Sequence, residues 1–431
     1  MSKAVGLNSR RFDGSRAITP MFFLTPLVTS AVPRLTWLFF FLVAIVLIVP
    51  FLRQGGDRRQ LIRPSAALIG VLLVALYAFI SAMWAANPSA AFGEASLLLG
   101  VILTTFAAGT ALATLDKQQL RRAALAFTAG AFLGAFFLLI ELLTDGAITR
   151  MAMNLITVLQ PDRAKHLVIS RGEVIKINLS MLNRNVAIVM FSLWPGLSIL
   201  RPAERGPGRM VSMGLFFLAV AVPVTISEHD SSQVALIGSP LVFLLAWAWR
   251  RATIRALAVL WCVAFVVVLP LDFLAFKADL HMAPWLPSSF RARVIIWEYT
   301  AERVLDHPWF GIGAASTPAL KEPRTVAEQP PGFVFPRSTG QHAHDLFLQT
   351  WYELGVAGVI LMAFAGAAVA LRISLLPFEA QPFAVATFAT FFAIAAFAWG
   401  IWQEWLTCAV GLLVIYSRVA ASLVGNDSAH D

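Results

Sequence analysis

Long apolar runs, repeated from one end of the chain to the other, constrain this sequence more than any other feature. Each run has about 17 to 25 residues, enough for a helix to cross a hydrocarbon core roughly 30 Å thick. Of the 431 residues, 58% are hydrophobic and 13% are charged. The runs lack the alternation of barrel strands, so we predict an all-α polytopic membrane protein with about twelve transmembrane helices.

The basic residues between the runs predict the orientation. We expect spans at 17–33, 35–52, 66–84, 93–115, 122–144, 184–200, 210–227, 232–249, 254–276, 346–371, 382–400 and 404–422. The first is interrupted by Pro20, Pro26 and Pro33 and barely has the length to cross. With twelve spans, the basic clusters fall on one side, which is then the cytoplasm, and both termini lie there.

The remaining bulk features exclude other classes of protein. The polar first 16 residues and the lack of a cleavage site predict that no signal peptide is removed. Cys262 and Cys408 lie within apolar runs, so no disulfide framework is expected. The net charge of +9 is explained by basic loops between spans, and nucleic acid is not an expected partner.

We expect a single integral membrane domain, 1–431, with two long segments on the periplasmic side, 145–183 and 277–345. The second is the large loop between spans nine and ten and holds the expected catalytic region. Ser288 and Ser289 predict the start of a helix running to residue 305, which His307-Pro308 would end. Its apolar stripe would consist of Val294, Trp297, Ala301, Val304 and Leu305.

The ionisable residues avoid the middle of the membrane. The histidines other than His430 map to the external side: His166, His229, His281, His307, His342 and His344. Glu141, Asp272 and Glu404 lie near the external ends of their spans. A proton or ion pathway normally needs such groups at depth, so the chemistry is expected at the outer interface.

Bond formation outside the cytoplasm has no ATP supply and therefore needs a donor that is already activated, such as a lipid-linked diphosphate sugar. Guanidinium groups would hold the diphosphate, and a base near neutral pKa would deprotonate an acceptor hydroxyl. Arg184 at the mouth of a span is the clearest anion ligand. For Arg291, a role as an anchor at the membrane interface and a role in binding the diphosphate both stay open. The remaining arginines are expected to be solvated or to touch lipid headgroups: Arg171, Arg303 and Arg337.

Two stretches form one long ordered pattern. They are RARVIIWEYTAERVLDHPWFGIGAAS and QHAHDLFLQTWYELGVAGVI, and together they resemble the hallmark region of the O-antigen ligase/polymerase superfamily. The matching positions are Arg293, Trp297, Asp306, Pro308, Gly311, Gly313, His344, Asp345, Glu353, Gly355 and Gly358. The short NRN stretch at 183–185 resembles the arginine-bearing entry to a central span in the ligase branch.

This resemblance implies a GT-C-like glycosyltransferase of the bacterial inner membrane with its active site at the periplasmic face. The donor would be an O-antigen linked to undecaprenyl diphosphate, the acceptor lipid A-core, and membrane lipids would surround both. No cofactor and no metal are implied. His344 would be the general base, supported by His342 and Asp345, and the donor diphosphate would be bound by Arg184, Arg291 and Arg293.

Other interpretations of the same residues stay open. His342 and His344 have the spacing of two zinc ligands, with His281, His307 or Asp345 to complete the site. His344 could instead cap the tenth span, and Glu353 is expected to hydrogen-bond within the bundle. The stretch SEHDSSQ at 227–233 invites a hydrolase interpretation, but neighbouring residues in a tight turn rarely form a relay. Contact with donor or acceptor is plausible there, although the arginine that the family often has after the serine is missing.

The function also has alternatives. A ligase is preferred over a polymerase because of the HAHD form, the NRN entry and the single dominant outer loop. A protein O-oligosaccharyltransferase shares the hallmark. A lipid or polysaccharide transporter is the alternative of a different class, and it should show related halves and broken polar helices at mid-depth, which the sequence lacks.

Overall fold

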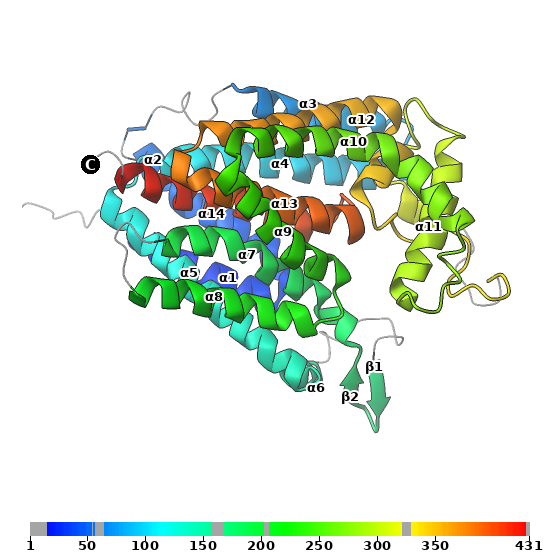
Figure 1. Ribbon diagram of the computed structural model, residues 1–431, viewed down its shortest axis with the longest axis horizontal. Helices are drawn as coiled ribbons and strands as arrows, with labels where there is room; N and C mark the ends of the chain where they lie inside the picture. The colour runs from blue at the N-terminus through cyan, green and yellow to red at the C-terminus, as the bar shows by residue number, and fades with distance from the viewer. Residues whose placement is uncertain are drawn as a thin grey trace, which may run out of the picture.

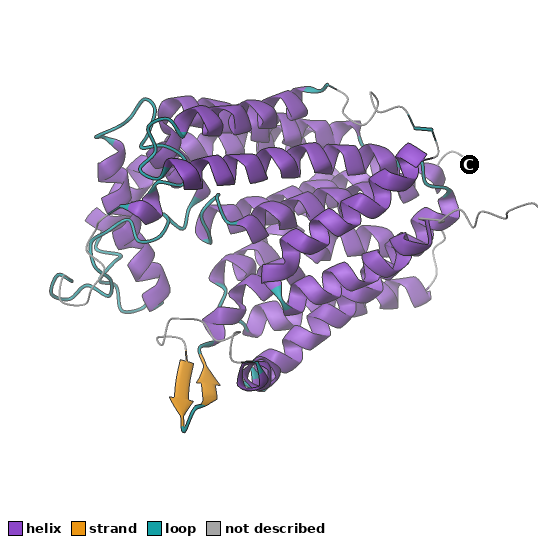
Figure 2. Ribbon diagram, turned by 180° about the vertical axis from the view of Figure 1, so that it is seen from behind, coloured by secondary structure: helices purple, strands orange, loops and turns teal. Residues whose placement is uncertain are grey.

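The computed structural model describes residues 15–53, 55–56, 64–156, 167–201, 207–320 and 329–427, and these are almost entirely helical. Figure 1 shows long helices lying side by side in one bundle, with α11, α6 and a small hairpin gathered at one end. Figure 2, the view from behind, shows that the strands of the described residues form this hairpin. The polytopic, all-α class is therefore confirmed.

A helix of the described chain lies at each of the twelve expected spans. Their bounds are α1 Ser15–Ala31, α2 Thr36–Arg53, α3 Ala66–Ser81, α4 Pro88–Leu112, α5 Lys117–Leu143, α7 Asn183–Leu200, α8 Pro207–Ile226, α9 Asp230–Ala248, α10 Arg250–Lys277, α12 Leu346–Arg372, α13 Gln381–Phe397 and α14 Glu404–Asp427. Among the described residues, eight helical stretches are long and apolar enough to cross a membrane, and Ala66–Ser81 and Met210–Ile226 are apolar but shorter. Crossing by all twelve stays a prediction.

Local chemistry explains several helix ends. Asn87 accepts a hydrogen bond from the backbone N–H of Ala90 and starts α4, and Asp116 forms a reciprocal capping box with Gln119 at α5. At the far end of α5, the buried Glu141 carboxylate accepts hydrogen bonds from the backbone N–H groups of Ile148 and Thr149. That contact ties the first turn of α6, Ala147–Leu155, to the end of α5.

The helices pack in two groups. In one, α1 lies along α5, and α7 and α14 complete a core that includes Phe22, Phe127 and Trp194. In the other, α12 lies between α3 and α10, and α9 lies along α13. The turns at 113–116, 249–250 and 373–380 lie at the end of the bundle opposite α11 (Figure 1).

The two long segments between spans both lie at the α11 end (Figure 1). The first contains α6, the antiparallel strands β1 Leu167–Ser170 and β2 Glu173–Ile177, and a short 3-10 turn, Leu179–Leu182. The second contains α11, Ser288–Val304, and a 3-10 turn, Thr317–Ala319. Residues 157–166 and 321–328, which include His166 and Pro323, lie outside the described residues. The location of both segments in the periplasm stays a prediction.

The predicted helix of the large loop is confirmed as α11, with two corrections. Its N-cap is Pro287, which makes no side-chain cap bond, and Ser289 lies inside the first turn, where its hydroxyl donates to Asp230 instead. Val294, Trp297, Ala301 and Val304 are buried as expected. Leu305 is 64% exposed, because the helix ends before it and its side chain no longer follows the apolar stripe.

α12 is broken at Gly355, and the glycine turn of the large loop fills the break. Gly355 has φ 62° and ψ −165°, so the backbone leaves the helix there. The groups freed by the break bond to the turn instead: Ile312 N–H to Tyr352 O at 3.1 Å, Gly313 N–H to Glu353 O at 2.9 Å, Val356 N–H to Pro308 O at 2.8 Å and Ala357 N–H to Trp309 O at 3.2 Å. The turn thus satisfies these four backbone groups, and the Leu354 carbonyl accepts a hydrogen bond from the Tyr77 hydroxyl at 3.1 Å.

The buried carboxylate of Glu353 holds the same junction. It accepts hydrogen bonds from the backbone N–H groups of Ala315 and Thr317, at 3.1 Å and 3.0 Å, and from the Trp402 indole. The expectation that Glu353 bonds within the bundle is confirmed. The spaced Asp-Pro-Gly-Gly and Glu-Gly-Gly motifs are therefore one structural joint between the large loop and α12.

Replacing Gly355 with alanine is expected to destabilise this joint. A Cβ there would lie 2.5 to 2.6 Å from backbone atoms of Trp309, Phe310 and Gly311, and the positive φ alone costs a non-glycine residue about 1–3 kcal/mol. We expect a lower melting temperature in detergent. Gly93→Ala in α4, where a Cβ meets nothing within 4 Å, is the matched control. Equal melting temperatures for the two variants would show that the turn does not need the glycine.

Candidate active site

Asp345 starts α12 and leaves the preceding histidine free for other contacts. Its Oδ1 accepts hydrogen bonds from the backbone N–H groups of Phe347 at 2.6 Å and Leu348 at 2.9 Å. Burial raises the pKa of Asp345 to about 7, against the opposing effect of these two bonds. The cap of the helix is therefore Asp345, and the interpretation of His344 as the cap is wrong.

His344 is held in a defined tautomer. Its backbone has φ 56°, in the left-handed region that histidine tolerates better than most residues. Nδ1 lies 2.7 Å from the carbonyl oxygen of Ala398. Since a carbonyl only accepts, Nδ1 carries the proton and Nε2 keeps its lone pair. Nε2 has no hydrogen-bond partner among the described residues, so it is open to a substrate proton.

The electrostatic environment keeps His344 neutral. Burial first, and then the positive charge of Arg293, lower its pKa to about 4, against the opposing effect of the bond to Ala398. At neutral pH the imidazole is therefore unprotonated at Nε2. A neutral imidazole with a fixed tautomer can accept a proton from a hydroxyl group.

His342 lies against His344. The two ring centroids are 4.1 Å apart, and the Nε2 of His342 is buried without a hydrogen-bond partner. Its pKa is well below the ordinary value, first because of burial and then because His344, Arg184 and Arg293 are near. Within the described residues, no group of three or more His, Cys, Asp or Glu side chains is placed to hold a metal ion.

The segment between α13 and α14, residues 398–403, forms one wall of the site. Ala398 holds His344, and Ile401 N–H donates to the Gln349 side chain of α12 at 3.2 Å. A Cβ on Gly400 would lie 2.9 Å from the Cβ of His342, so only glycine fits that approach. From the sequence we expected residues 382–400 to lie in a span and predicted no role for this segment, although the stretch WGIW, with two tryptophans, was a visible signal.

Arg184, in the first turn of α7, reaches the same wall. Its guanidinium carbon lies 5.7 Å from the centroid of the Trp405 ring, and Trp405 meets Trp399 edge-on at 4.8 Å. Guanidinium groups stack on indole faces while their N–H groups stay available to an anion. The structure thus places Arg184 near the histidines, although it is far from them in the sequence.

Arg293, on α11, joins the site from the large loop. Its Nη1 lies 3.8 Å from Asp230 Oδ2 at the start of α9, and Ser289 Oγ bonds the same carboxylate oxygen at 3.2 Å. Trp297, one turn further along α11, packs against Phe290 and Phe397. Burial lowers the pKa of Arg293 and Asp230 opposes this, yet a guanidinium stays charged.

Arg291 and Arg171 are not brought to the histidines in the same way. Arg291 has a buried Nε without a partner, and no ion pair involving it is found among the described residues. Arg171 is exposed at the tip of the β1–β2 hairpin with φ 51°. Binding of the diphosphate by Arg291 stays a prediction.

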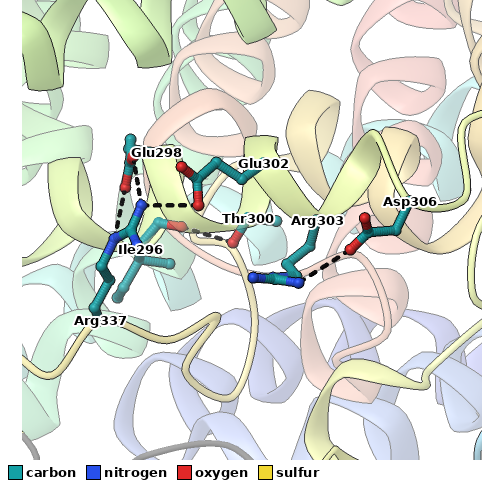
Figure 3. A network of polar contacts seen from close by, with 7 residues as sticks. All are labelled: Ile296, Glu298, Thr300, Glu302, Arg303, Asp306 and Arg337. Atoms are coloured by element: carbon teal, nitrogen blue, oxygen red, sulfur yellow. Dashed lines mark hydrogen bonds and ion pairs between the residues drawn. The ribbon is translucent and has the colours of Figure 1, made fainter.

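Two other arginines of the large loop form ion pairs, as Figure 3 shows. Arg337 Nη2 lies 2.8 Å from Glu298 Oε1 and 2.8 Å from Glu302 Oε2, while Arg303 Nη1 lies 3.1 Å from Asp306 Oδ2. The expectation of a solvated side chain holds for Arg303, which is 44% exposed, and is corrected for Arg337, which is paired with two carboxylates of α11. Arg337 joins the segment before the histidines to α11.

Replacing Arg337 with alanine is expected to loosen the chain just before the histidines. Glu298, only 6% exposed, would lose its cationic partner, and an unpaired buried carboxylate is unfavourable. We expect faster cleavage by a protease that does not cut at arginine. Arg303→Ala, which breaks an exposed pair on the same helix, should leave the cleavage rate unchanged. Equal rates for the two variants would mean that the pair with Glu298 does not hold this segment.

Comparison with known proteins agrees with this geometry. A family model described as O-antigen ligase matches residues 213–363, which include α9, α10, α11 and the histidines. This part of the chain is therefore similar to O-antigen ligases. A protein of Rickettsia conorii with the provisional name of a polysaccharide ligase is 23% identical over 383 residues, covering 85% of this chain and 84% of that relative. Both similarities support a multi-pass membrane protein of the glycosyltransferase-like kind.

Proposed function

We propose that this protein joins an O-antigen polysaccharide from undecaprenyl diphosphate to the outer-core sugar of lipid A-core. The reaction would take place at the periplasmic face of the bacterial inner membrane, with both chain termini in the cytoplasm. The single observation that carries the proposal is the neutral His344, whose Nδ1–H is fixed on Ala398 and whose Nε2 is open, beside Arg293.

The proposed step is one displacement. His344 Nε2 takes the proton of the acceptor hydroxyl while the hydroxyl oxygen forms a bond to the anomeric carbon of the donor sugar. The bond from that carbon to the diphosphate oxygen breaks, and undecaprenyl diphosphate leaves with the electron pair. Attack from the face opposite the leaving group inverts the anomeric configuration.

The arginines give this step its electrostatic support. Negative charge grows on the diphosphate as the bond breaks, so a guanidinium aimed at it stabilises the transition state more than the ground state. Arg184 and Arg293 reach the histidines from α7 and α11, and we include Arg291 as a third ligand. His342 supports His344 by packing against its ring at 4.1 Å between centroids, and Asp345 by starting the helix that follows it.

A complementation experiment tests the function. A strain that lacks its O-antigen ligase would carry this chain, and its lipopolysaccharide would be resolved by gel electrophoresis. A restored ladder on lipid A-core supports the ligase. Rescue of a polymerase-deficient strain, whose core bears a single repeat, would point to an O-antigen polymerase. Glycan attached to periplasmic protein would point to a protein O-oligosaccharyltransferase, and export without new linkage to a transporter.

The proposed reaction needs no metal, which gives a separate prediction. Treatment of the purified protein with a chelator is expected to leave the transfer rate unchanged, because His344 and the guanidiniums supply the base and the positive charge. The measurement is the rate before and after chelation, then after addition of zinc. Activity that disappears with the chelator and returns with zinc would revive a site built on His342 and His344.

A further inference from the structure

The turn between α8 and α9 places a third histidine beside the site. Ser227 Oγ bonds Val224 O at 2.7 Å and receives the backbone N–H of His229 at 3.3 Å, so the turn is rigid before α9 begins. His229 is 2% exposed, and its Nδ1 lies 2.7 Å from Ser232 Oγ. The ring orientation is thus set by its own turn.

The other nitrogen of this ring has no partner. His229 Nε2 is buried and makes no hydrogen bond with any described residue. A buried polar group without a partner is unfavourable, and such groups are usually satisfied by water or by a ligand.

The ring faces the wall that also holds His344. It stacks on Trp399, with centroids 4.6 Å apart and planes 28° apart, and Trp399 directly follows the residue that binds His344 Nδ1. Burial first, and then the charge of Arg293, lower the pKa of His229 to about 3. The uncharged ring is therefore near Arg293, and through Trp399 it packs against the segment that holds His344.

We propose that His229 binds a hydroxyl group of a sugar ring in the glycan substrate through Nε2. This inference rests on the proposed function and adds a substrate-binding residue to the same site. A hydroxyl can both donate and accept, so it satisfies Nε2 in either tautomer that the Ser232 contact allows. The nearby guanidiniums of Arg184 and Arg293 suit the phosphates, and the uncharged ring suits a neutral sugar.

Three substitutions separate a binding role from a packing role. In His229→Gln the side-chain amide can reach the position of Nε2, in His229→Asn it reaches only that of Nδ1, and His229→Ala has neither. Purified variants would be assayed for transfer with lipid A-core and with undecaprenyl diphosphate-linked O-antigen, each varied in turn. We expect His229→Ala and His229→Asn to raise one KM about tenfold, as loss of one hydrogen bond does, with kcat little changed, and His229→Gln to restore it.

The arms of the experiment identify the sugar and guard against a folding defect. A rise in the KM of lipid A-core assigns the hydroxyl to the acceptor, and a rise in that of the lipid-linked glycan assigns it to the donor. His281→Ala is the matched control, because His281 is also buried with an unpaired nitrogen but stacks on Phe276 and meets Phe333 instead of the site. That control should leave both KM values unchanged.

The inference is overturned if both KM values of His229→Ala are those of the unaltered protein, or if all three variants lose activity equally as their melting temperature falls. Direct titration of each substrate, followed by the tryptophan fluorescence of Trp399 and its neighbours, keeps the two proposals apart. Glycan binding that weakens in His229→Ala supports the inference even if no transfer occurs, in which case the proposed function alone fails.

Discussion

Replacing His344 with asparagine is expected to slow glycan transfer by about 10²–10⁴-fold, the usual contribution of a general base. Asparagine tolerates the left-handed backbone at this position, and its amide N–H can still reach the Ala398 carbonyl. Only the acceptor nitrogen at the position of Nε2 is lost. Alanine should abolish transfer as well, with an unchanged level of protein in the membrane.

The pH dependence follows from the same geometry. His344 acts as a base only when neutral, so activity is lost as the pH falls through its pKa, which burial lowers to about 4. The acid limb of kcat/KM for the free enzyme is therefore expected near pH 4 rather than near 6.5. Arg293→Gln removes a charge that lowers this pKa, so its acid limb should move to higher pH.

His307→Ala is the control for both measurements. His307 lies in the same large loop, but its side chain is exposed and belongs to the turn after α11. Its rate and its pH profile should match those of the unaltered protein. Normal ladders from His344→Asn and His344→Ala would defeat the assignment of the base.

Replacing Arg293 with alanine is expected to lower kcat/KM by about 10²–10³-fold, the effect of removing one donor aimed at a developing negative charge. The loss should fall mainly on kcat, because the charge on the diphosphate grows in the transition state. Arg293→Lys keeps the charge but loses the forked geometry, so it should recover only part of the rate.

The control for Arg293 lies on the same helix. Arg303 is exposed and paired with Asp306, and Arg303→Ala should change kcat/KM only slightly. Asp230, the partner of Arg293, is partly exposed and stays hydrated when the guanidinium is removed, so misfolding is not the expected cause of any loss. Equal kcat/KM values for Arg293→Ala and Arg303→Ala would show that Arg293 has no role in the site.

The helices were predictable because one strong rule governs them. Apolar runs long enough for a membrane must satisfy their backbone groups internally, and a helix of the described chain lies at each expected position. Finer features depend on contacts that periodicity does not encode. Leu305 was placed on the apolar stripe, yet α11 ends at Val304, and Ser289 was read as a cap although Asp230 takes its hydroxyl.

The site was predictable where its residues belong to one pattern or stand out by their energetics. The histidine pair and Arg293 belong to one ordered pattern, and Arg184 was found from the energetics of a cation at a span entrance. Ala398 and Trp399 were not assigned, and substrate contact was considered for the stretch 227–233 without singling out His229, because these two turns meet the histidines only after the bundle has formed. A tryptophan or a serine in a short turn has many ordinary explanations in a sequence.

The interruption of α12 at Gly355 separates the histidines mechanically from the membrane beneath them. The part after the break is bonded to the turn at Val356 and Ala357, and beyond these residues it can change its tilt when bilayer thickness changes. The part before it is fastened to the large loop by Tyr352, Glu353 and their partners. Lipid composition is therefore expected to alter the lower bundle while the spacing between His344 and α11 persists.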